Sequence, residues 1–159
     1  MRLLLLGCSG FVGRELVPFL LELGHTITLV SRHGNPFPAL ASERLSCLQL
    51  DPSDPASWQH DRLEMALSQA DGVVNLAGEP IAEKRWTPTH CQLLLQSRVR
   101  TTELLVAAIG ALEKRPSVLI NGSAVGFYGS STSAQFTEAS PAGSDFLAQI
   151  CQQWEAASA

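Results

Sequence analysis

The chain has 159 residues, of which 45% are hydrophobic and 16% charged, and its formal net charge is −4. This composition predicts one globular domain over 1–159 and gives no reason to expect a nucleic-acid partner. No apolar stretch approaches the roughly 20 residues that span a membrane. The four cysteines are scattered, without C-x-x-C pairs or histidines at metal-ligand spacing, so we expect reduced thiols, no metal site and a cytoplasmic protein.

Strand and helix patterns alternate along the chain. Apolar runs predict strands at 2–7, 27–30, 45–50, 72–76 and 118–120, the last continuing into Asn121 and Gly122. Helices are expected at 11–23, 61–69, 88–113 and 143–157, and loops at 33–44, 53–58 and 123–142. Successive β–α units predict the α/β class, with a doubly wound parallel sheet and right-handed crossovers.

Two helices carry apolar stripes that predict their buried faces. The stripes are Val12, Leu16, Phe19, Leu20 and Leu23 in the first helix, and Leu95, Val99, Thr102, Val106 and Ile109 in the third. Pro18 predicts a bend in the first helix, because it removes a backbone donor. Gly24 is expected to cap the same helix.

Three glycines, Gly7, Gly10 and Gly13, lie between the first strand and the first helix. A glycine-rich turn that opens a helix offers backbone N–H groups and a partial positive charge to a pyrophosphate. The strand–turn–helix–strand context favours dinucleotide binding over an isolated motif match. The alternative is that these glycines serve only a tight turn and close helix–sheet packing.

The second strand ends in Ser31 and Arg32. An acidic residue there would bind the ribose 2′-hydroxyl of NAD and repel the 2′-phosphate of NADP. A hydroxyl followed by a guanidinium suits a phosphate instead, so we expect NADP (NADPH) as the cofactor. The alternative is a solvated arginine at a strand end.

Ligands of such sheets bind beyond the carboxyl ends of the strands, which makes the next residues candidates. Asp51 could accept a hydrogen bond from adenine, or be a loop or cap aspartate. Asn75 begins a small-residue turn that could approach the cofactor, or it ties neighbouring strands together. Ser123 and Tyr128 could donate protons to a substrate carbonyl as hydride arrives, or have packing and capping roles.

Taken together, the segments 7–13 (GCSGFVG) and 75–78 (NLAG) resemble the extended short-chain dehydrogenase/reductase superfamily. The chain is similar, more narrowly, to its epimerase family branch through NLAGEPIAEKRW (75–86), QSRVRTTELLVAAI (96–109), SAVGFYG (123–129) and FLAQICQQWEAA (146–157). The resemblance implies a Rossmann-type NADP-binding fold. It implies as cofactor-binding residues Gly7, Ser9, Gly10, Phe11, Val12, Gly13, Ser31, Arg32, Asp51, Leu76, Ala77, Gly78 and Ser123.

The chain departs from the superfamily in two respects. A Tyr-x-x-x-Lys pair usually stands on the helix after the fifth strand, where this chain has Leu147 and Cys151. The resembling branch shares that loss, and Ser123 and Tyr128 are left as candidate catalytic proton handlers. Family members also continue with further strands and a substrate lobe, so we expect a chain without that C-terminal lobe. An uncovered sheet edge would then favour association, including a homo-oligomer.

Two further segments have two interpretations each. The segment Glu79–Trp86 could border a substrate pocket, or be a solvated loop anchored by its tryptophan. Arg98 could contact an anion, or be an exposed helix arginine.

Two functions remain open at this point. One is an NADP-dependent oxidoreductase or epimerase-like enzyme for a small polar or nucleotide-sugar substrate. The other is a non-catalytic NADP-binding sensor or interaction module, favoured by the absent Tyr/Lys pair. A structural domain that binds no nucleotide is a third reading.

Overall fold

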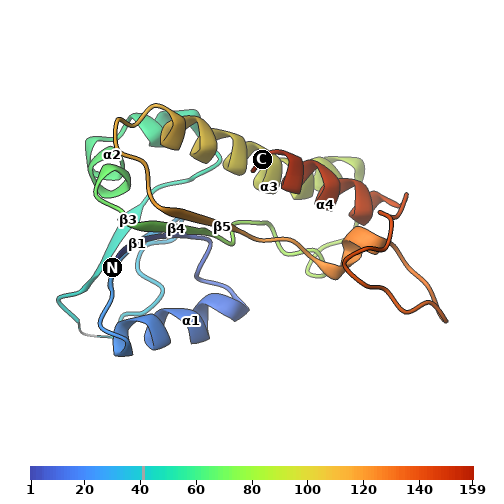
Figure 1. Ribbon diagram of the computed structural model, residues 1–159, viewed down its shortest axis with the longest axis horizontal. Coiled ribbons are helices and arrows are strands. Elements are labelled where there is room, and N and C mark those ends of the chain that lie inside the picture. The colour runs from blue at the N-terminus through green and yellow to red at the C-terminus, as the bar shows by residue number, and fades with distance from the viewer. Residues whose placement is uncertain (41) are drawn as a thin grey trace.

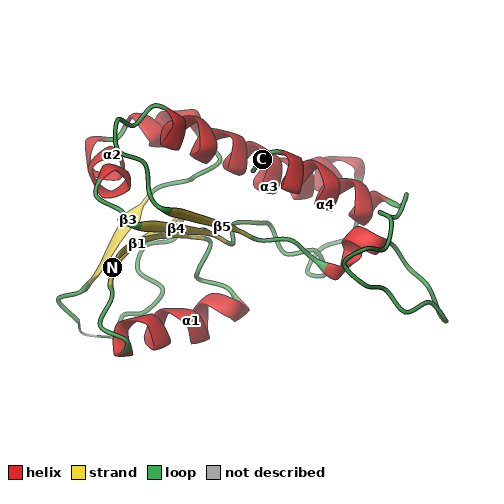
Figure 2. Cartoon of the chain, in the orientation of Figure 1, coloured by secondary structure: helices red, strands yellow, loops and turns green. Residues whose placement is uncertain are grey.

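Five parallel strands form the central layer of the computed structural model, which describes residues 1–40 and 42–159 (Figures 1 and 2). They are β1 (Arg2–Leu6), β2 (Thr26–Ser31), β3 (Leu45–Gln49), β4 (Gly72–Asn75) and β5 (Val118–Asn121), in the order β3-β2-β1-β4-β5. The doubly wound parallel sheet predicted from the sequence is confirmed. The expected connection 33–44 includes residue 41, which lies outside the described residues.

Helices cover both faces of this sheet (Figure 2). α1 (Phe11–Glu22) lies on one face, and α2 (Asp61–Ser68), α3 (Pro88–Gly110) and α4 (Phe146–Ala156) lie on the other. Two of the expected loops contain a short 3₁₀ helix, η1 (Pro55–Gln59) and η2 (Val125–Tyr128). α3 ends three residues earlier than predicted, and α4 begins three residues later.

The leucine run of β1 is explained by burial on both faces of the sheet. Leu3 and Leu5 pack on the α1 side, while Leu4 and Leu6 pack on the side of α2 and α3. Successive side chains of a strand point to opposite faces, so a central strand between two helix layers is apolar throughout.

The predicted apolar stripe of α1 is confirmed for Leu16 and Leu20, which pack against the core, and is wrong for Val12, Phe19 and Leu23, which are exposed. The buried residues of the helix are Gly13, Val17 and Leu21. A Cβ at Gly13 would lie 2.1 Å from the carbonyl oxygen of Cys8, so the helix approaches the strand through its glycine. Gly13 therefore determines which face of α1 contacts the sheet, and a search for apolar periodicity does not detect this face because glycine has no side chain.

α1 contains Pro18, and a Schellman motif with Gly24 as its left-handed residue terminates the helix after Glu22. Gly24 has a φ of +84°, and its N–H donates to the carbonyl of Leu21. The N–H of His25 donates to the carbonyl of Leu20. The predicted glycine cap is confirmed.

The buried face of α3 is rotated by about one residue from the predicted stripe. Its buried residues are His90, Leu94, Thr101, Thr102 and Leu105. Thr102 belongs to the predicted stripe and is buried as expected, because it finds hydrogen-bond partners there and polar groups are buried where such partners exist.

The outer strand β5 is less covered than the others on its α1 side. The register pairs Ile120 with Val74, which places both on that face, yet Ile120 is 54% exposed. Val118 is 42% exposed.

Among the described residues, no helix combines the length and the apolar character that crossing a membrane requires.

Candidate functional site

A cleft lies at the carboxyl edge of the sheet, beyond the ends of β1, β2, β3 and β4. Nine of the predicted cofactor-binding residues line it: Gly7, Ser9, Gly10, Ser31, Arg32, Asp51, Leu76, Ala77 and Gly78. The lining also includes His33, Glu79, Ser97 and Thr101. The sheet order explains this convergence, because β2 and β4 flank β1 and bring the residues that follow them to either side of the glycine turn.

The three glycines of the turn have different structural reasons. Gly7 has a φ of +73°, and a Cβ there would lie 2.4 Å from the backbone of Ala77. Gly13 is fixed by its contact with Cys8. A Cβ at Gly10, in contrast, would meet only the Gly7 carbonyl oxygen at 3.9 Å. The fold thus requires Gly7 and Gly13, while Gly10 leaves open space at the start of α1.

Gly10 is also the N-cap of α1, and it has no side chain with which to cap the helix. The other α-helices of the described chain begin with capping side chains, His60 for α2, Thr87 for α3 and Asp145 for α4. The first N–H groups of a helix need partners, and a ligand can supply them. Phe11 and Val12 stand in this first turn with exposed side chains, outside the lining of the cleft.

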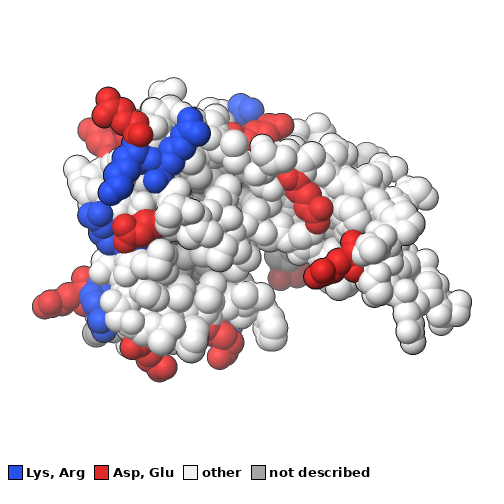
Figure 3. Space-filling view, in the orientation of Figure 1, with Lys and Arg blue, Asp and Glu red and all other residues white. Residues whose placement is uncertain are grey.

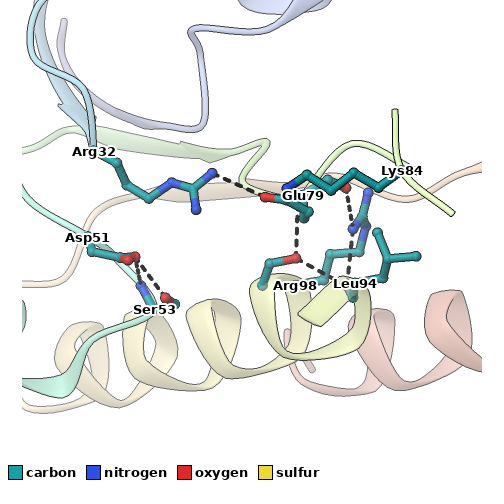
Figure 4. Close-up of polar contacts among 8 residues, drawn as sticks. Arg32, Asp51, Ser53, Glu79, Lys84, Leu94 and Arg98 are labelled. Atoms are coloured by element: carbon teal, nitrogen blue, oxygen red, sulfur yellow. Dashed lines mark hydrogen bonds and ion pairs between the residues drawn. The ribbon is translucent and has the colours of Figure 1, made fainter. Parts of the chain in front are cut away.

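Glu79 holds two cations at the mouth of the cleft. Its Oε1 lies 2.8 Å from Nζ of Lys84, and its Oε2 lies 3.4 Å from Nη2 of Arg32 (Figure 4). These three residues are the cleft ion pairs of the following text. The hydrogen bond and charge of Lys84, followed by those of Arg32, lower the pKa of Glu79 against the opposing effect of burial.

Arg98 fixes the backbone next to Glu79. Its Nη1 donates to the carbonyls of Glu79 and Leu94, both at 3.1 Å, and its guanidinium lies over the ring of Trp154 at 5.4 Å. Burial lowers the pKa of Arg98. The exposed helix arginine considered above is therefore wrong, because the guanidinium is enclosed between the turn after β4 and α4.

Asp51 borders the cleft and also shapes its own loop. Its Oδ1 accepts hydrogen bonds from the backbone N–H and the hydroxyl of Ser53, at 2.9 and 2.7 Å (Figure 4). Asp51 therefore has the loop-capping role that was one of its two interpretations. Because Asp51 also lines the cleft, its hydrogen bond to adenine stays a prediction.

Behind the cleft, four residues form what we call the buried polar cluster: Asn75, Thr102, Asn121 and Trp154. Nδ2 of Asn75 donates to Thr102 Oγ1 at 2.9 Å and to Asn121 Oδ1 at 2.7 Å. Nε1 of Trp154 donates to the same threonine oxygen at 3.1 Å. Asn75 therefore ties β4 to β5 and to α3, as its structural interpretation holds.

Ser123 and Tyr128 lie on the β5–α4 side of the molecule, outside the lining of the cleft. The Ser123 hydroxyl donates to the Glu155 carboxylate, and both residues are exposed. The ring of Tyr128 stacks on Phe136 with an interplanar angle of 11° and meets Phe127 edge-on. The stacking is a packing role for Tyr128, and its part in proton transfer stays a prediction.

The family model described as the NAD dependent epimerase/dehydratase family matches residues 3–148. The chain belongs to this family. It is 35% identical over 155 residues to the chloroplastic SDR39U1 homolog of Arabidopsis thaliana, covering 94% of this chain and 42% of that protein. It is 37% identical over 151 residues to an epimerase family protein of Mycobacterium tuberculosis, covering 95% and 46%.

A solved structure in this epimerase family is similar over the whole chain. The crystal structure of human epimerase family protein SDR39U1 (isoform 2) with NADPH has a TM-score of 0.78 and 33% identity, covering 100% of this chain and 49% of the human chain. The chain thus spans about half the length of the relatives it matches.

The face of α4 where a Tyr/Lys pair would stand has no such groups in this family member. Leu147 and Cys151 lie there, and burial raises the pKa of the Cys151 thiol. Burial also raises the pKa of Cys8, in the glycine turn, to about 12, so neither thiol is activated as a nucleophile.

Cationic side chains are unevenly distributed in this family member. The sequence has no lysine or arginine after Arg115. Figure 3 shows Lys and Arg gathered at the α2 end of the visible face, while the part formed by α4 shows only acidic and uncharged residues. Arg32 lines the cleft, and Lys84 and Arg98 bond to Glu79 beside it.

Sequence reasoning missed the role of Glu79 within the cleft. It considered 79–86 as one segment, whereas the structure buries Glu79 and leaves Trp86 46% exposed, with Nε1 of Trp86 bonded to the Ile81 carbonyl. A single acidic residue directly after the Asn-Leu-Ala-Gly turn of a parallel strand is the signal that could have separated it from its exposed neighbours.

Proposed function

We propose that this chain binds NADP(H) in the cleft at the carboxyl edge of the sheet. The first-turn N–H groups of α1 hold the pyrophosphate, with Ser9 beside them and Phe11 and Val12 supplying backbone. The hydroxyl of Ser31 and the guanidinium of Arg32 hold the 2′-phosphate. Bidentate guanidinium–phosphate contacts and helix N-termini are common ways to bind such groups.

The remaining contacts follow from the cleft walls. Asp51 accepts a hydrogen bond from the adenine amino group through the oxygen that Ser53 leaves open. Leu76, Ala77 and Gly78 lie along the sugar and nicotinamide side. When bound, the nicotinamide supplies or accepts a hydride, and the chain provides binding, orientation and exclusion of water.

The open space at Gly10 carries this proposal. The fold itself explains Gly7 and Gly13, but among the described residues no atom lies close enough to a Cβ at Gly10 to require glycine there. Absence of a Cβ there allows a phosphate to approach the start of α1. The similarity to human SDR39U1, whose crystal structure is with NADPH, supports the same assignment.

Titration of the purified chain with NADPH and with NADH, followed by cofactor fluorescence, tests the proposal. We expect tighter binding of NADPH, and loss of binding in Gly10→Val. The matched control is Gly110→Val, because a Cβ at Gly110 has no atom within 4 Å in the described structure. A folded wild-type chain that binds neither cofactor, or a Gly10→Val variant that binds normally, contradicts the proposal.

We further propose that the whole protein is an oxidoreductase or epimerase-like enzyme for a small polar or nucleotide-sugar substrate. Its family and its dinucleotide cleft support this activity. Ser123 and Tyr128 are the proposed proton handlers, because they follow the strand next to the cleft. NADPH oxidation with a substrate panel should slow in Ser123→Ala and Tyr128→Phe. Full turnover in both variants rejects these two assignments.

A non-catalytic NADP-binding sensor is the second candidate. The occupation of the Tyr/Lys positions by Leu147 and Cys151 favours it. A whole protein that binds NADPH tightly and leaves it unoxidised by carbonyl and nucleotide-sugar compounds supports the sensor, and substrate-dependent oxidation excludes it.

A further inference from the structure

A carboxylate and a guanidinium face each other across the cleft. Arg32 follows β2 and Glu79 follows β4, and β1 with its glycine turn lies between these two strands. The Arg32–Glu79 pair therefore connects the two sides of the cleft mouth (Figure 4). Both residues line the same space, so a ligand there meets the pair directly.

The two partners differ in how firmly they are held. The Glu79 side chain is 9% exposed, and its backbone is fixed by Ser97 and Arg98, with its N–H 2.9 Å from Ser97 Oγ. The Arg32 side chain is 45% exposed and makes the longer ion pair, at 3.4 Å. Lys84 lies closer to Glu79, at 2.8 Å. Arg32 is thus the movable member.

We propose that Glu79 is a specificity-determining residue, a resident carboxylate that competes with the 2′-phosphate of NADP for Arg32. This inference rests on the proposed NADP binding. It assigns Arg32 two anionic partners, Glu79 in the free chain and the phosphate in the complex.

The exchange is feasible because Glu79 keeps a cation when Arg32 leaves. Lys84 remains bonded to its other carboxylate oxygen, so no buried charge is left unpaired. A ligand that needs a minor state binds more weakly by the fraction of that state. NADP(H) needs Arg32 released from Glu79, whereas NAD(H) carries no phosphate and leaves the pair intact. Glu79 therefore reduces the preference for NADP over NAD.

The test compares the ratio of the NADH and NADPH dissociation constants among variants of the full chain. Glu79→Gln keeps the shape and removes the charge, and we expect this ratio to rise about three- to fivefold, the size of one half-exposed ion pair. Glu83→Gln is the matched control, since it removes the same charge from an exposed position of the same segment. Its ratio should change less than about twofold.

A second pair of variants tests whether the change in this ratio depends on Arg32. In an Arg32→Ala background, Glu79→Gln should leave the ratio unchanged, because the competition no longer exists. If Glu79→Gln does not fold, as judged by thermal unfolding, Glu79→Asp withdraws the carboxylate from Arg32 and should raise the ratio in the same direction.

An unchanged ratio, or a fall in NADPH affinity, in folded Glu79→Gln overturns the inference while wild-type NADPH binding stands. It would mean that Glu79 orients Arg32 for the phosphate or does not affect it. Failure of the wild type to bind NADPH, or normal binding by Gly10→Val, overturns the proposed function and this inference with it. The two failures are therefore distinguishable.

Discussion

The buried polar cluster and the cleft ion pairs stand at the same edge of the sheet and are built on opposite principles. The cluster is neutral and enclosed, and Asn75 and Thr102 are both fully buried. The ion pairs are charged and partly exposed to solvent, because the side chains of Arg32 and Lys84 are about half exposed while that of Glu79 is buried. Neutral, satisfied groups hold the strands together, while the charged groups pair through side chains that are partly exposed to solvent.

The difference follows from the cost of leaving a group unpaired. A buried amide that has lost its hydrogen-bond partners destabilises the fold by its full desolvation penalty. An exposed cation that leaves an anion regains water, so surface ion pairs contribute little to stability. Substitutions in the two groups should therefore separate into effects on folding and effects on binding.

The largest expected effect is that of Asn75→Ala. It removes bonds to Thr102 and Asn121 and leaves the Ala77 N–H without its side-chain acceptor. The free energy of unfolding, measured in urea, should fall by about 3 kcal/mol. The exposed Gln69→Ala is the control and should stay within about 0.5 kcal/mol of wild type. A loss below about 1 kcal/mol for Asn75→Ala would contradict the structural role of the cluster.

Trp154→Phe tests one bond of the same cluster. Phenylalanine keeps an aromatic ring near Gly122 but removes the donor to Thr102 Oγ1. Because Thr102 still accepts from Asn75 and donates to the Arg98 carbonyl, the unfolding free energy should fall by only about 1 kcal/mol. A loss as large as that of Asn75→Ala would contradict the small share assigned to this one hydrogen bond.

The ion pairs should differ from the cluster in their response to pH. The lowered pKa of Glu79 makes its stabilisation present at neutral pH and lost as the pH falls below the ordinary value of 4.5. The stability difference between wild type and Glu79→Gln should be at most about 1 kcal/mol at pH 7, after screening by solvent, and should become progressively smaller as the pH is lowered below 4.5. Urea unfolding at neutral and at acidic pH measures it. A difference that persists at low pH would contradict an ionic origin.

The smallest effect is expected for Lys84→Met. The Lys84 side chain is 58% exposed, so its pair with Glu79 should contribute about 0.5 kcal/mol or less to the free energy of unfolding. In the same variant Arg32 is the remaining cation paired with Glu79. Releasing Arg32 to a phosphate would then leave Glu79 unpaired, so the ratio of NADH to NADPH dissociation constants should fall. A stability loss with an unchanged ratio would assign Lys84 to the fold.

The strands and the glycine turn could be predicted because their pattern is local. Apolar runs bounded by glycines place β1 and β4 to within a residue or two, and Gly24 marks the end of α1. The helix faces were harder, since Gly13 sets one contact without any hydrophobic side chain. In α3 the predicted stripe includes the buried Thr102 but not the buried Leu94, Thr101 and Leu105.

The cleft was predictable in outline and not in its electrostatics. Residues that follow strands were correctly expected at one edge, and nine of the thirteen named cofactor residues line the cleft. The pair of Arg32 with Glu79 joins residues 47 apart in sequence. Strand order decides which distant residues meet, and a single sequence does not contain that order explicitly.

The central place of β1 has a consequence for how the chain acquires its cleft during folding. Arg2 pairs with Thr26, 24 residues on, whereas Leu3 pairs with Gly72, 69 residues on. Closing the longer loop costs about 1 kcal/mol more in chain entropy, so the β1–α1–β2 unit is favoured to form earlier. The glycine turn then exists before its opposite wall, and only the arrival of β4 brings Ala77 against Gly7. The cleft is therefore completed late, and a refolding chain forms it only when the sheet closes around its first strand.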